Sequence, residues 1–271
     1  MTQRTGHVWT ADKLDFLEKY LPAFQLVCKR LWNENNCGTV YVDGFAGPGR
    51  NSIDEKVRDG SPLIAIKQKH KFDKYFLCEK DRRNFENLKS EIENLNSDLD
   101  IRMIQGDFNL HVSSILQQIE YWRPTFFFLD PEGLELEWET VRKIGSRKKA
   151  DLFILISGSG VLRASGSNLS EAHYETVTRF YGNEGWRDRL DKTPATIDTH
   201  IGKRRFELAL DLYLEGLRNL GFTTVERYLL AKNSRNADLH ALVFASKNST
   251  ANRIADDVIK SIQQGQQISL F

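Results

Sequence analysis

A carboxylate followed by three closely spaced glycines is the first feature of the sequence that could do chemistry. Asp43 ends an apolar run over 39–43 that predicts a buried strand, and the turn after it reads Gly-Phe-Ala-Gly-Pro-Gly. Gly47 and Gly49 have no Cβ atom, so their backbone can approach a bound ligand closely. The Asp43 carboxylate can accept a hydrogen bond from an ammonium group. The block, which includes Phe45, predicts a site for a nucleotide-like ligand with an amino-acid group.

Two other interpretations of this glycine block are open. It could be a tight turn without a ligand, or the Gly-x-Gly-x-x-Gly/Ala fingerprint of dinucleotide-binding proteins, which Gly47, Gly49 and Ser52 nearly fit. In that fingerprint the glycines open a helix whose N-terminus holds a pyrophosphate. Here a charged segment over 54–59 separates the glycines from the next predicted helix, which begins at Ser61. We therefore expect a ligand other than NAD.

Acidic residues also end the next two predicted strands. Glu79 ends the second strand and can bind both hydroxyls of a ribose. Asp107 follows the third strand and could accept from an adenine amino group, while Phe108 packs on the ring. Asp107 could instead be the N-cap of a helix predicted over 109–121. Together with Asp43, these carboxylates predict S-adenosylmethionine (SAM) as the cofactor, because each suits one part of that molecule.

The fourth predicted strand ends in Asp130-Pro131-Glu132-Gly133. In amino methyltransferases this position carries an Asp/Asn-Pro-Pro-aromatic motif that orients the target amine and stacks on a flipped-out base. Here Glu-Gly replaces the second proline and the aromatic residue, as in the similar motif of guanine-N2 tRNA dimethyltransferases. We expect Asp130 and Pro131 to orient the acceptor amine and Arg163 to contact an anionic group of the substrate. The alternatives are a plain strand-ending turn and a surface arginine.

The elements that must position these residues alternate between strands and helices, starting with a helix over about 10–34. Two strand-like segments joined by a polar turn end the pattern, which is typical of class I methyltransferases. We expect their Rossmann-like α/β fold: a mostly parallel seven-stranded sheet, helices on both faces and a C-terminal antiparallel hairpin. One domain should span 1–271, with an insertion at about 157–204 near the ligand-binding edge. The predicted strands are 39–43, 75–79, 101–104, 125–129, 151–156, 223–231 and 239–246.

Composition narrows the function classes. The 271 residues include 38 Lys and Arg against 37 Asp and Glu, so bulk attraction to nucleic acid is not expected, although basic runs at 147–149 and 203–205 could contact phosphate. Three cysteines without CxxC spacing and six histidines give no convincing metal site. Without a signal-peptide core or a membrane-length apolar run, we expect a cytoplasmic protein with no membrane partner. Four ring-bearing residues of the insertion could form a substrate wall: His173, Tyr174, Tyr181 and Trp186.

Taken together, the motifs resemble those of the three-Cys-motif partner (TcmP) proteins. The matching blocks are 9–14 (Trp-Thr-x-x-Lys-Leu), 41–49, 60–63 (Gly-Ser-Pro-Leu), Glu79, 129–133 with Trp138, and 162–163. The resemblance implies a bacterial or phage-associated protein of methyltransferase-like fold. It adds Lys13 and Ser61 to the residues expected to line the SAM pocket. As partner it implies a neighbouring protein with three cysteines that looks like a radical-SAM protein.

Two functions are consistent with these observations. The first is a SAM-dependent methyltransferase that acts on a nitrogen, with a nucleobase of DNA or RNA as the expected acceptor. The second is a non-catalytic SAM-binding subunit that supports the three-Cys-motif protein, and the Glu132-Gly133 departure favours it. We expect the first, because the Asp-Pro pair is kept at the strand end next to the predicted SAM site.

Overall fold

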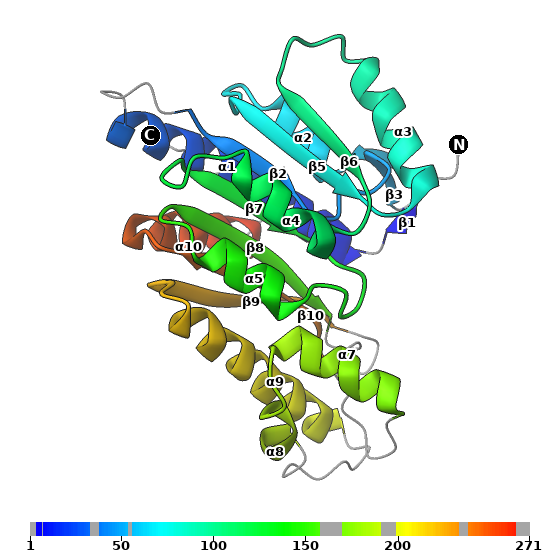
Figure 1. The fold of residues 1–271 in the computed structure, drawn as a ribbon, viewed down its shortest axis with the longest axis vertical. Coiled ribbons are helices and arrows are strands. Elements are labelled where there is room, and N and C mark those ends of the chain that lie inside the picture. Colours follow the sequence, from blue (N-terminus) through cyan, green and yellow to red (C-terminus); the bar gives the residue numbers. More distant parts are fainter. Residues whose placement is uncertain are drawn as a thin grey trace.

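A computed structural model of the chain describes residues 4–6, 8–32, 38–53, 56–157, 170–190, 199–232 and 238–263. The largest feature of these residues is a seven-stranded sheet with the order β6-β5-β2-β7-β8-β10-β9 (Figure 1). Its strands are β2 (Val40–Asp43), β5 (Lys74–Glu79), β6 (Ile101–Gln105), β7 (Thr125–Leu129), β8 (Ala150–Ser157), β9 (Thr224–Lys232) and β10 (Asp238–Ser246). All seven predicted strands are therefore confirmed.

The strand directions identify the fold class. Neighbouring strands from β6 to β8 pair in parallel, whereas β10 pairs antiparallel with both β8 and β9. This order, with one reversed strand beside the edge, is that of the class I methyltransferase fold, which confirms the predicted class. β7 and β8 are buried along their whole length, as expected for strands covered on both faces.

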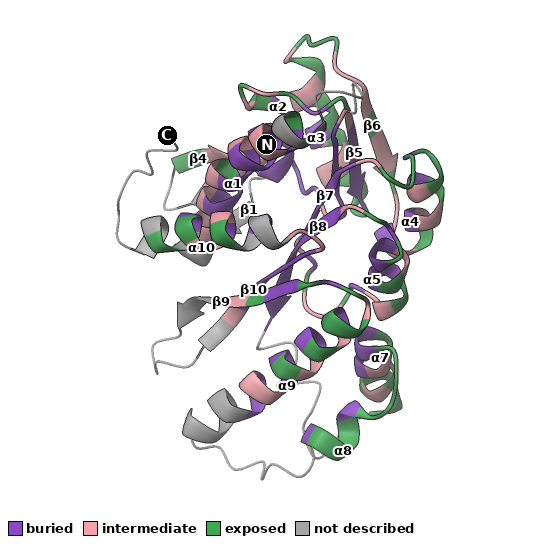
Figure 2. Cartoon of the chain, turned by 90° about the vertical axis from the view of Figure 1, so that its left-hand side faces the viewer, coloured by how far each residue is buried: buried purple, intermediate pink, exposed green. Residues whose placement is uncertain are grey.

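Helices cover both faces of this sheet (Figures 1 and 2). Successive strand residues point to opposite faces, so Tyr41 and Phe126 pack with one helical layer while Val42 and Phe127 pack with the other. The first layer is α1 (Val8–Trp32), α2 (Ser61–Lys67), α3 (Arg82–Glu93) and α10 (Ser249–Gln263). The second is α4 (Phe108–Gln117), α5 (Trp138–Gly145), α7 (Glu171–Tyr181), α8 (Trp186–Leu190) and α9 (Thr199–Asn219). No helix within the described ranges has an apolar stretch long enough to cross a membrane.

The segment between the glycine block and α2 is a β-hairpin, which corrects the loop suggested by the sequence. β3 (Arg50–Ile53) pairs antiparallel with β4 (Lys56–Asp59), and β1 (Arg4–Gly6) adds to β3 in parallel. The Arg58 guanidinium of β4 forms an ion pair with Asp15 of α1. The hairpin strands read Arg-Asn-Ser-Ile and Lys-Val-Arg-Asp, so they are mostly polar and hydrophobic periodicity could not reveal them.

The described helices of the insertion contribute to the core. The Tyr181 hydroxyl donates to the carbonyl oxygen of Ala209 at 3.0 Å, and the Trp186 ring N–H donates to the Thr178 hydroxyl at 3.1 Å. Both rings are buried in the cluster that α7, α8 and α9 build under the sheet. Both rings also line a cavity of about 200 Å³, so the expectation that Tyr181 and Trp186 form a substrate wall stays a prediction.

Two helix starts differ from the prediction, whereas α2 begins at Ser61 as expected, with Gly60 as its N-cap. α1 begins at Val8, two residues earlier than expected. α4 begins at Phe108, and Asp107 is its N-cap, because the Asp107 side chain accepts from the N–H of Asn109 at 3.0 Å. The N-cap alternative for Asp107 is therefore confirmed.

Candidate functional site

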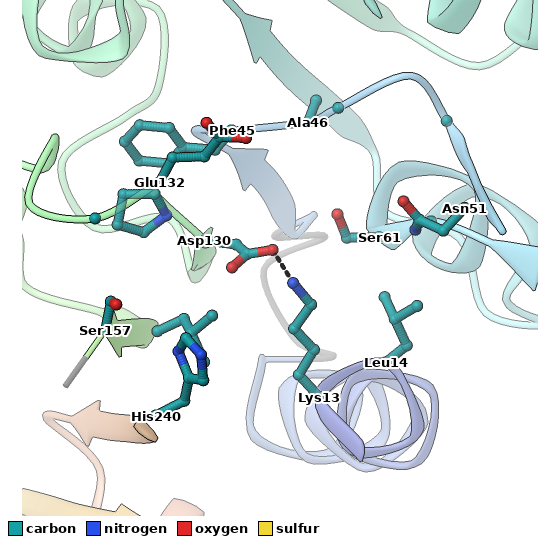
Figure 3. Close-up of a pocket in the computed structure, with 16 residues that line it drawn as sticks. Lys13, Leu14, Phe45, Ala46, Asn51, Ser61, Asp130, Glu132, Ser157 and His240 are labelled. Carbon is teal, nitrogen blue, oxygen red and sulfur yellow. Dashed lines mark hydrogen bonds and ion pairs between the residues drawn. The ribbon is translucent and has the colours of Figure 1, made fainter. Parts of the chain in front are cut away.

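A cavity of about 270 Å³ opens at the carboxyl ends of β2, β7 and β8, the edge at which open α/β sheets bind ligands. α1, the start of α2 and the first part of β10 border it (Figure 3). The cavity brings together seven predicted site residues: Lys13, Phe45, Gly47, Gly49, Ser61, Asp130 and Pro131. The other described residues that line it are Leu14, Ala46, Asn51, Gly60, Glu132, Gly133, Leu155, Ser157 and His240.

The glycine loop presents bare backbone to this cavity. Gly47 and Gly49 have φ angles of +66° and +85°, in the left-handed region that favours glycine. A Cβ atom on Gly47 would meet no atom within 4 Å, so it would enter open space. After Gly49 the chain enters β3 rather than a helix. The loop thus has the close-approach surface of a ligand site but not the helix N-terminus of the dinucleotide fingerprint.

Glu79 fixes the position of the glycine loop. One of its carboxylate oxygens accepts from the Gly47 N–H and the other from the Asp81 N–H, each at 2.7 Å. Glu79 is buried at the end of β5, and it does not line the cavity. Asp81 is the N-cap of α3, so Glu79 links the turn after β2 to the start of α3.

Asp43 lies fully buried beside the cavity-lining residues Phe45 and Ser61. Its carboxylate accepts from the Tyr41 hydroxyl at 3.0 Å and from the Phe45 N–H at 3.3 Å. The pKa of Asp43 is raised to about 7, mainly by burial. Hydrogen bonds from Ser61 and Tyr41 oppose this rise, and the charge of Asp130 adds to it. A cation bound nearby would favour the ionised form of this carboxylate.

Lys13 and Asp130 form an ion pair inside the cavity (Figure 3). Lys13 belongs to α1 and Asp130 follows the last residue of β7, so the pair joins the N-terminal helix to the strand end. The side chains are only 8% and 16% exposed, and water screens such a pair less than a surface pair. Pro131, the next residue, is buried, and Gly133 takes a φ of +67°, so the turn holds Asp130 at the strand end.

Asp107 and Phe108 lie outside the cavity lining. The Lys80 ammonium donates to Asp107 at 3.0 Å. Partial burial raises the pKa of Asp107, but hydrogen bonds from Lys80 and Asn109 outweigh it and the net shift is downward. The Phe108 ring is buried and meets the Phe45 ring edge-on, with centroids 6.0 Å apart. Phe108 therefore supports a ring that lines the cavity.

Sequence reasoning missed several cavity residues, of which Asn51, Ser157 and His240 carry polar groups. His240 of β10 is the Cα partner of Ser157, the last residue of β8. A usable signal existed, because a strand antiparallel to β8 begins at the edge where β8 ends. The predicted hairpin therefore implied that its second strand brings its first residues to the ligand edge. Asn51 lies on β3, in the hairpin that the sequence did not reveal.

The basic run at 147–149 does not act as one phosphate-binding cluster. Arg147 is buried and donates to the carbonyl oxygen of Ile119 at 3.3 Å and to that of Glu120. Burial lowers the pKa of Arg147, with the Glu120 charge opposing the shift. Arg147 thus satisfies carbonyl groups in the segment after α4, which corrects the expectation for this residue.

Three further expectations concern Arg163, the cysteines and metal binding. Arg163 lies outside the described residues. Cys28 and Cys78 are buried and form no disulfide with another described residue, while Cys37 also lies outside the described ranges. Among the described residues, no group of three His, Cys, Asp or Glu side chains could hold a metal ion.

No family model matches the chain, and no curated protein matches it in sequence. Among solved structures, a DUF519 protein from Legionella pneumophila is similar with a TM-score of 0.55 and 11% identity, over 95% of this chain and 93% of that one. The N-terminal domain of human METTL16 in complex with SAH has a TM-score of 0.44 and 14% identity, and the match covers 85% of this chain and 69% of that one. M. jannaschii TYW2 in complex with AdoMet has a TM-score of 0.42 and 12% identity, and the match covers 82% of this chain and 74% of that one.

The similarity to the Legionella protein shows a shared fold, in agreement with the strand order of the sheet. None of these matches tests the resemblance to three-Cys-motif partner proteins, which stays a prediction.

Proposed function

We propose that this chain is a SAM-dependent methyltransferase that acts on a neutral nitrogen of a nucleobase in RNA or DNA. The observation that carries the proposal is the Lys13–Asp130 ion pair, which lies in the same cavity as the bare backbone of Gly47. A methyl transfer needs a place for the donor and a group that orients the acceptor beside it. The cavity offers residues suited to both.

SAM fits the residues on the donor side of the cavity. Its amino-acid part would lie against Gly47 and Gly49, where a side chain would obstruct the ligand. Ser61 and Asn51 add polar atoms to that part of the lining. The raised pKa of Asp43 suits a residue close to a ligand ammonium group, because the cation would favour the carboxylate form.

The adenosine part would extend from the loop toward the ends of β5 and β6. Each Glu79 oxygen accepts one N–H bond and has a second lone pair, so Glu79 can also accept from ribose hydroxyls. Asp107 would lie at the adenine end, with Phe108 supporting Phe45 from the core. These assignments extend beyond the described cavity and belong to the proposal.

When bound, SAM supplies an electrophilic methyl group. Asp130 would accept a hydrogen bond from the acceptor N–H and so orient the nitrogen lone pair. Lys13 holds the carboxylate in place and already balances its charge, so Asp130 attracts a second cation less strongly than an unpaired carboxylate would. The pair therefore favours a neutral amine, such as the exocyclic amine of a nucleobase, over a protonated amino group. Phe45, on the cavity wall, supplies an aromatic ring for stacking in a motif that lacks one.

A transfer assay with methyl-labelled SAM tests this proposal. The acceptors would be unmodified RNA, denatured DNA and, as the cationic comparison, a lysine-rich peptide. We expect label in RNA or DNA from wild type and no label from Asp130→Ala, which lacks a hydrogen-bond acceptor at this position. Label in the peptide would contradict a neutral acceptor, and transfer at full rate by Asp130→Ala would contradict the orienting role of Asp130.

Glu132 favours a second candidate, a SAM-binding subunit without transfer chemistry that would support a three-Cys-motif protein. Its side chain is exposed and lines the cavity at the position where nucleobase methyltransferases carry a second proline. If SAM binds in the micromolar range but no acceptor is labelled by the purified chain, this candidate is favoured. Methyl transfer by the chain alone would exclude it.

A further inference from the structure

We propose that His240 accepts the proton that the acceptor nitrogen loses on methylation, which makes it a catalytic residue. The inference rests on the proposed function and deepens it, because it assigns the base for the same site. His240 lies on β10, a strand that contributes none of the residues expected from the sequence. Figure 3 shows its imidazole ring in the cavity, near Ser157 and on the same side as Asp130.

The sheet holds His240 in this place. His240 and Ser157 are Cα partners at the end of the β8–β10 ladder, which continues in regular antiparallel register to Ser246 and Asp151. On its other side, β10 pairs with β9, where His240 is opposite Ala231 and the register shifts next to it. The irregularity lies at the cavity edge of β10, where β-bulges often redirect a side chain.

The other described titratable groups of the cavity are less suited to this step. Lys13, from α1, carries an ammonium group that can only donate. Asp130, after β7, is paired with Lys13 and is needed to orient the acceptor. Glu132, also after β7, is exposed to water. An imidazole is the side chain that can be neutral and basic near pH 7, so His240 suits the task best.

The proton balance of the step defines what His240 does. The nitrogen lone pair forms the new N–C bond while the S–C bond breaks, and the electron pair of that bond stays on sulfur. As positive charge builds on the nitrogen in the same transition state, its N–H bond breaks toward the imidazole, and the electrons of that bond stay on the nitrogen. The resulting imidazolium releases the proton to water. No other reactant is needed, and such proton transfer contributes about 10²–10⁴-fold to a rate.

His240→Gln tests the inference, with His111→Gln on α4, away from the cavity, as the matched control. We expect His240→Gln to bind SAM within about 3-fold of wild type by calorimetry, while single-turnover transfer falls about 100-fold or more. The pH profiles of transfer by wild type and His240→Gln should differ, because only wild type has an imidazole that must be neutral to accept the proton. Added imidazole should partly restore His240→Ala. Unchanged rate and pH profile in His240→Gln would overturn the inference.

A binding measurement gives a second readout that does not depend on turnover. In ¹H–¹³C NMR spectra, the imidazole resonance missing from His240→Gln should shift when AMP, CMP or GMP is added to the S-adenosylhomocysteine complex. No shift with any of the three would contradict a ring at the acceptor position. If wild type binds SAM but labels no acceptor, the proposed function fails and the His240 inference fails with it. Full transfer by His240→Gln overturns the His240 inference alone.

Discussion

Lys13 and Asp130, which are 117 residues apart in the chain, form an ion pair on the wall of the cavity that the glycine loop also lines. One partner comes from the first helix and the other from the end of a central strand. The pair therefore connects a helix that precedes the sheet to the strand end where acceptor-orienting residues are expected. The ammonium of Lys13 and the carboxylate of Asp130 balance each other, so the pair carries no net charge.

The two partners should affect stability and activity differently. Asp130→Ala removes the group that would accept from the acceptor N–H, so we expect SAM affinity within a few-fold of wild type and methyl transfer reduced by about 100-fold or more. Lys13→Met leaves the carboxylate without its cation, which should cost about 1–3 kcal/mol, less than a fully buried pair because some exposure remains. Calorimetry, transfer assays and urea unfolding measure these quantities.

The double variant isolates the coupling between Lys13 and Asp130. If the ion pair acts as described, Lys13→Met should cost less stability in the Asp130→Asn background than in the wild type. Equal costs in both backgrounds would show that Lys13 stabilises the fold through its hydrocarbon chain and not through Asp130.

Asp43 should make the stability depend on pH in an unusual direction. Its pKa is about 7 in the folded chain and about 4 when unfolded, so between these values the folded state binds a proton that the unfolded state does not. Stability from this group therefore falls as pH rises, by at most about 1.4 kcal/mol per unit, and levels off above pH 7. In Asp43→Asn this dependence should be absent.

The measurement is the free energy of unfolding of wild type and Asp43→Asn at several pH values from 4.5 to 8. Asp151, whose burial raises its pKa to about 6, acts in the same direction but is present in both proteins, so it cancels in the difference. We expect the variant to gain stability relative to wild type as pH rises. A constant difference over this range would contradict the raised pKa of Asp43.

Glu79 should control the loop rather than the fold as a whole. In Glu79→Gln the side-chain amide offers one carbonyl oxygen to two N–H donors, so one of them is left unpaired, at a cost of about 1–3 kcal/mol. SAM affinity should fall about 10-fold or more, because the Gly47 backbone loses its anchor. Glu93→Gln, at an exposed position of α3, is the control. Equal SAM affinity in Glu79→Gln and wild type would show that the loop is held by other contacts.

Much of the fold could be predicted because its signals are local. β7 and β8 are runs of apolar residues buried on both faces, and the carboxylates at strand ends follow directly from that assignment. The hairpin β3–β4 could not be predicted, because its residues are mostly polar and show no apolar period. The Lys13–Asp130 contact could not be predicted either, because its partners are 117 residues apart in the chain. The motifs identified Lys13 and Asp130 separately as site residues, but only the packing of α1 on the sheet brings the two side chains into contact.

Sequence alone could not show how the aromatic residues of the insertion pack. Tyr181 and Trp186 are buried, as large apolar rings often are, and both also line a cavity. His240 had no motif around it, and only its pairing with Ser157 brings it to the cavity. A residue such as His240 can be identified as a site residue only when the order and the direction of the strands are both known.

Binding of SAM to Gly47→Ala, measured by calorimetry beside wild type and Gly221→Ala, tests the assignment of this cavity to SAM. Both glycines have positive φ, +66° and +83°, and at both a Cβ atom would meet no other atom within 4 Å. Because of the positive φ, alanine should cost about 1–2 kcal/mol of backbone strain at either position. The two variants differ in that Gly47 lines the cavity, whereas Gly221 lies between α9 and β9.

We predict micromolar SAM binding by wild type and by Gly221→Ala, and binding weaker by about 30-fold or more in Gly47→Ala, because the new methyl group would occupy ligand space. Equal affinity in all three proteins would contradict the assignment of this cavity, and no binding to wild type would contradict the proposed cofactor.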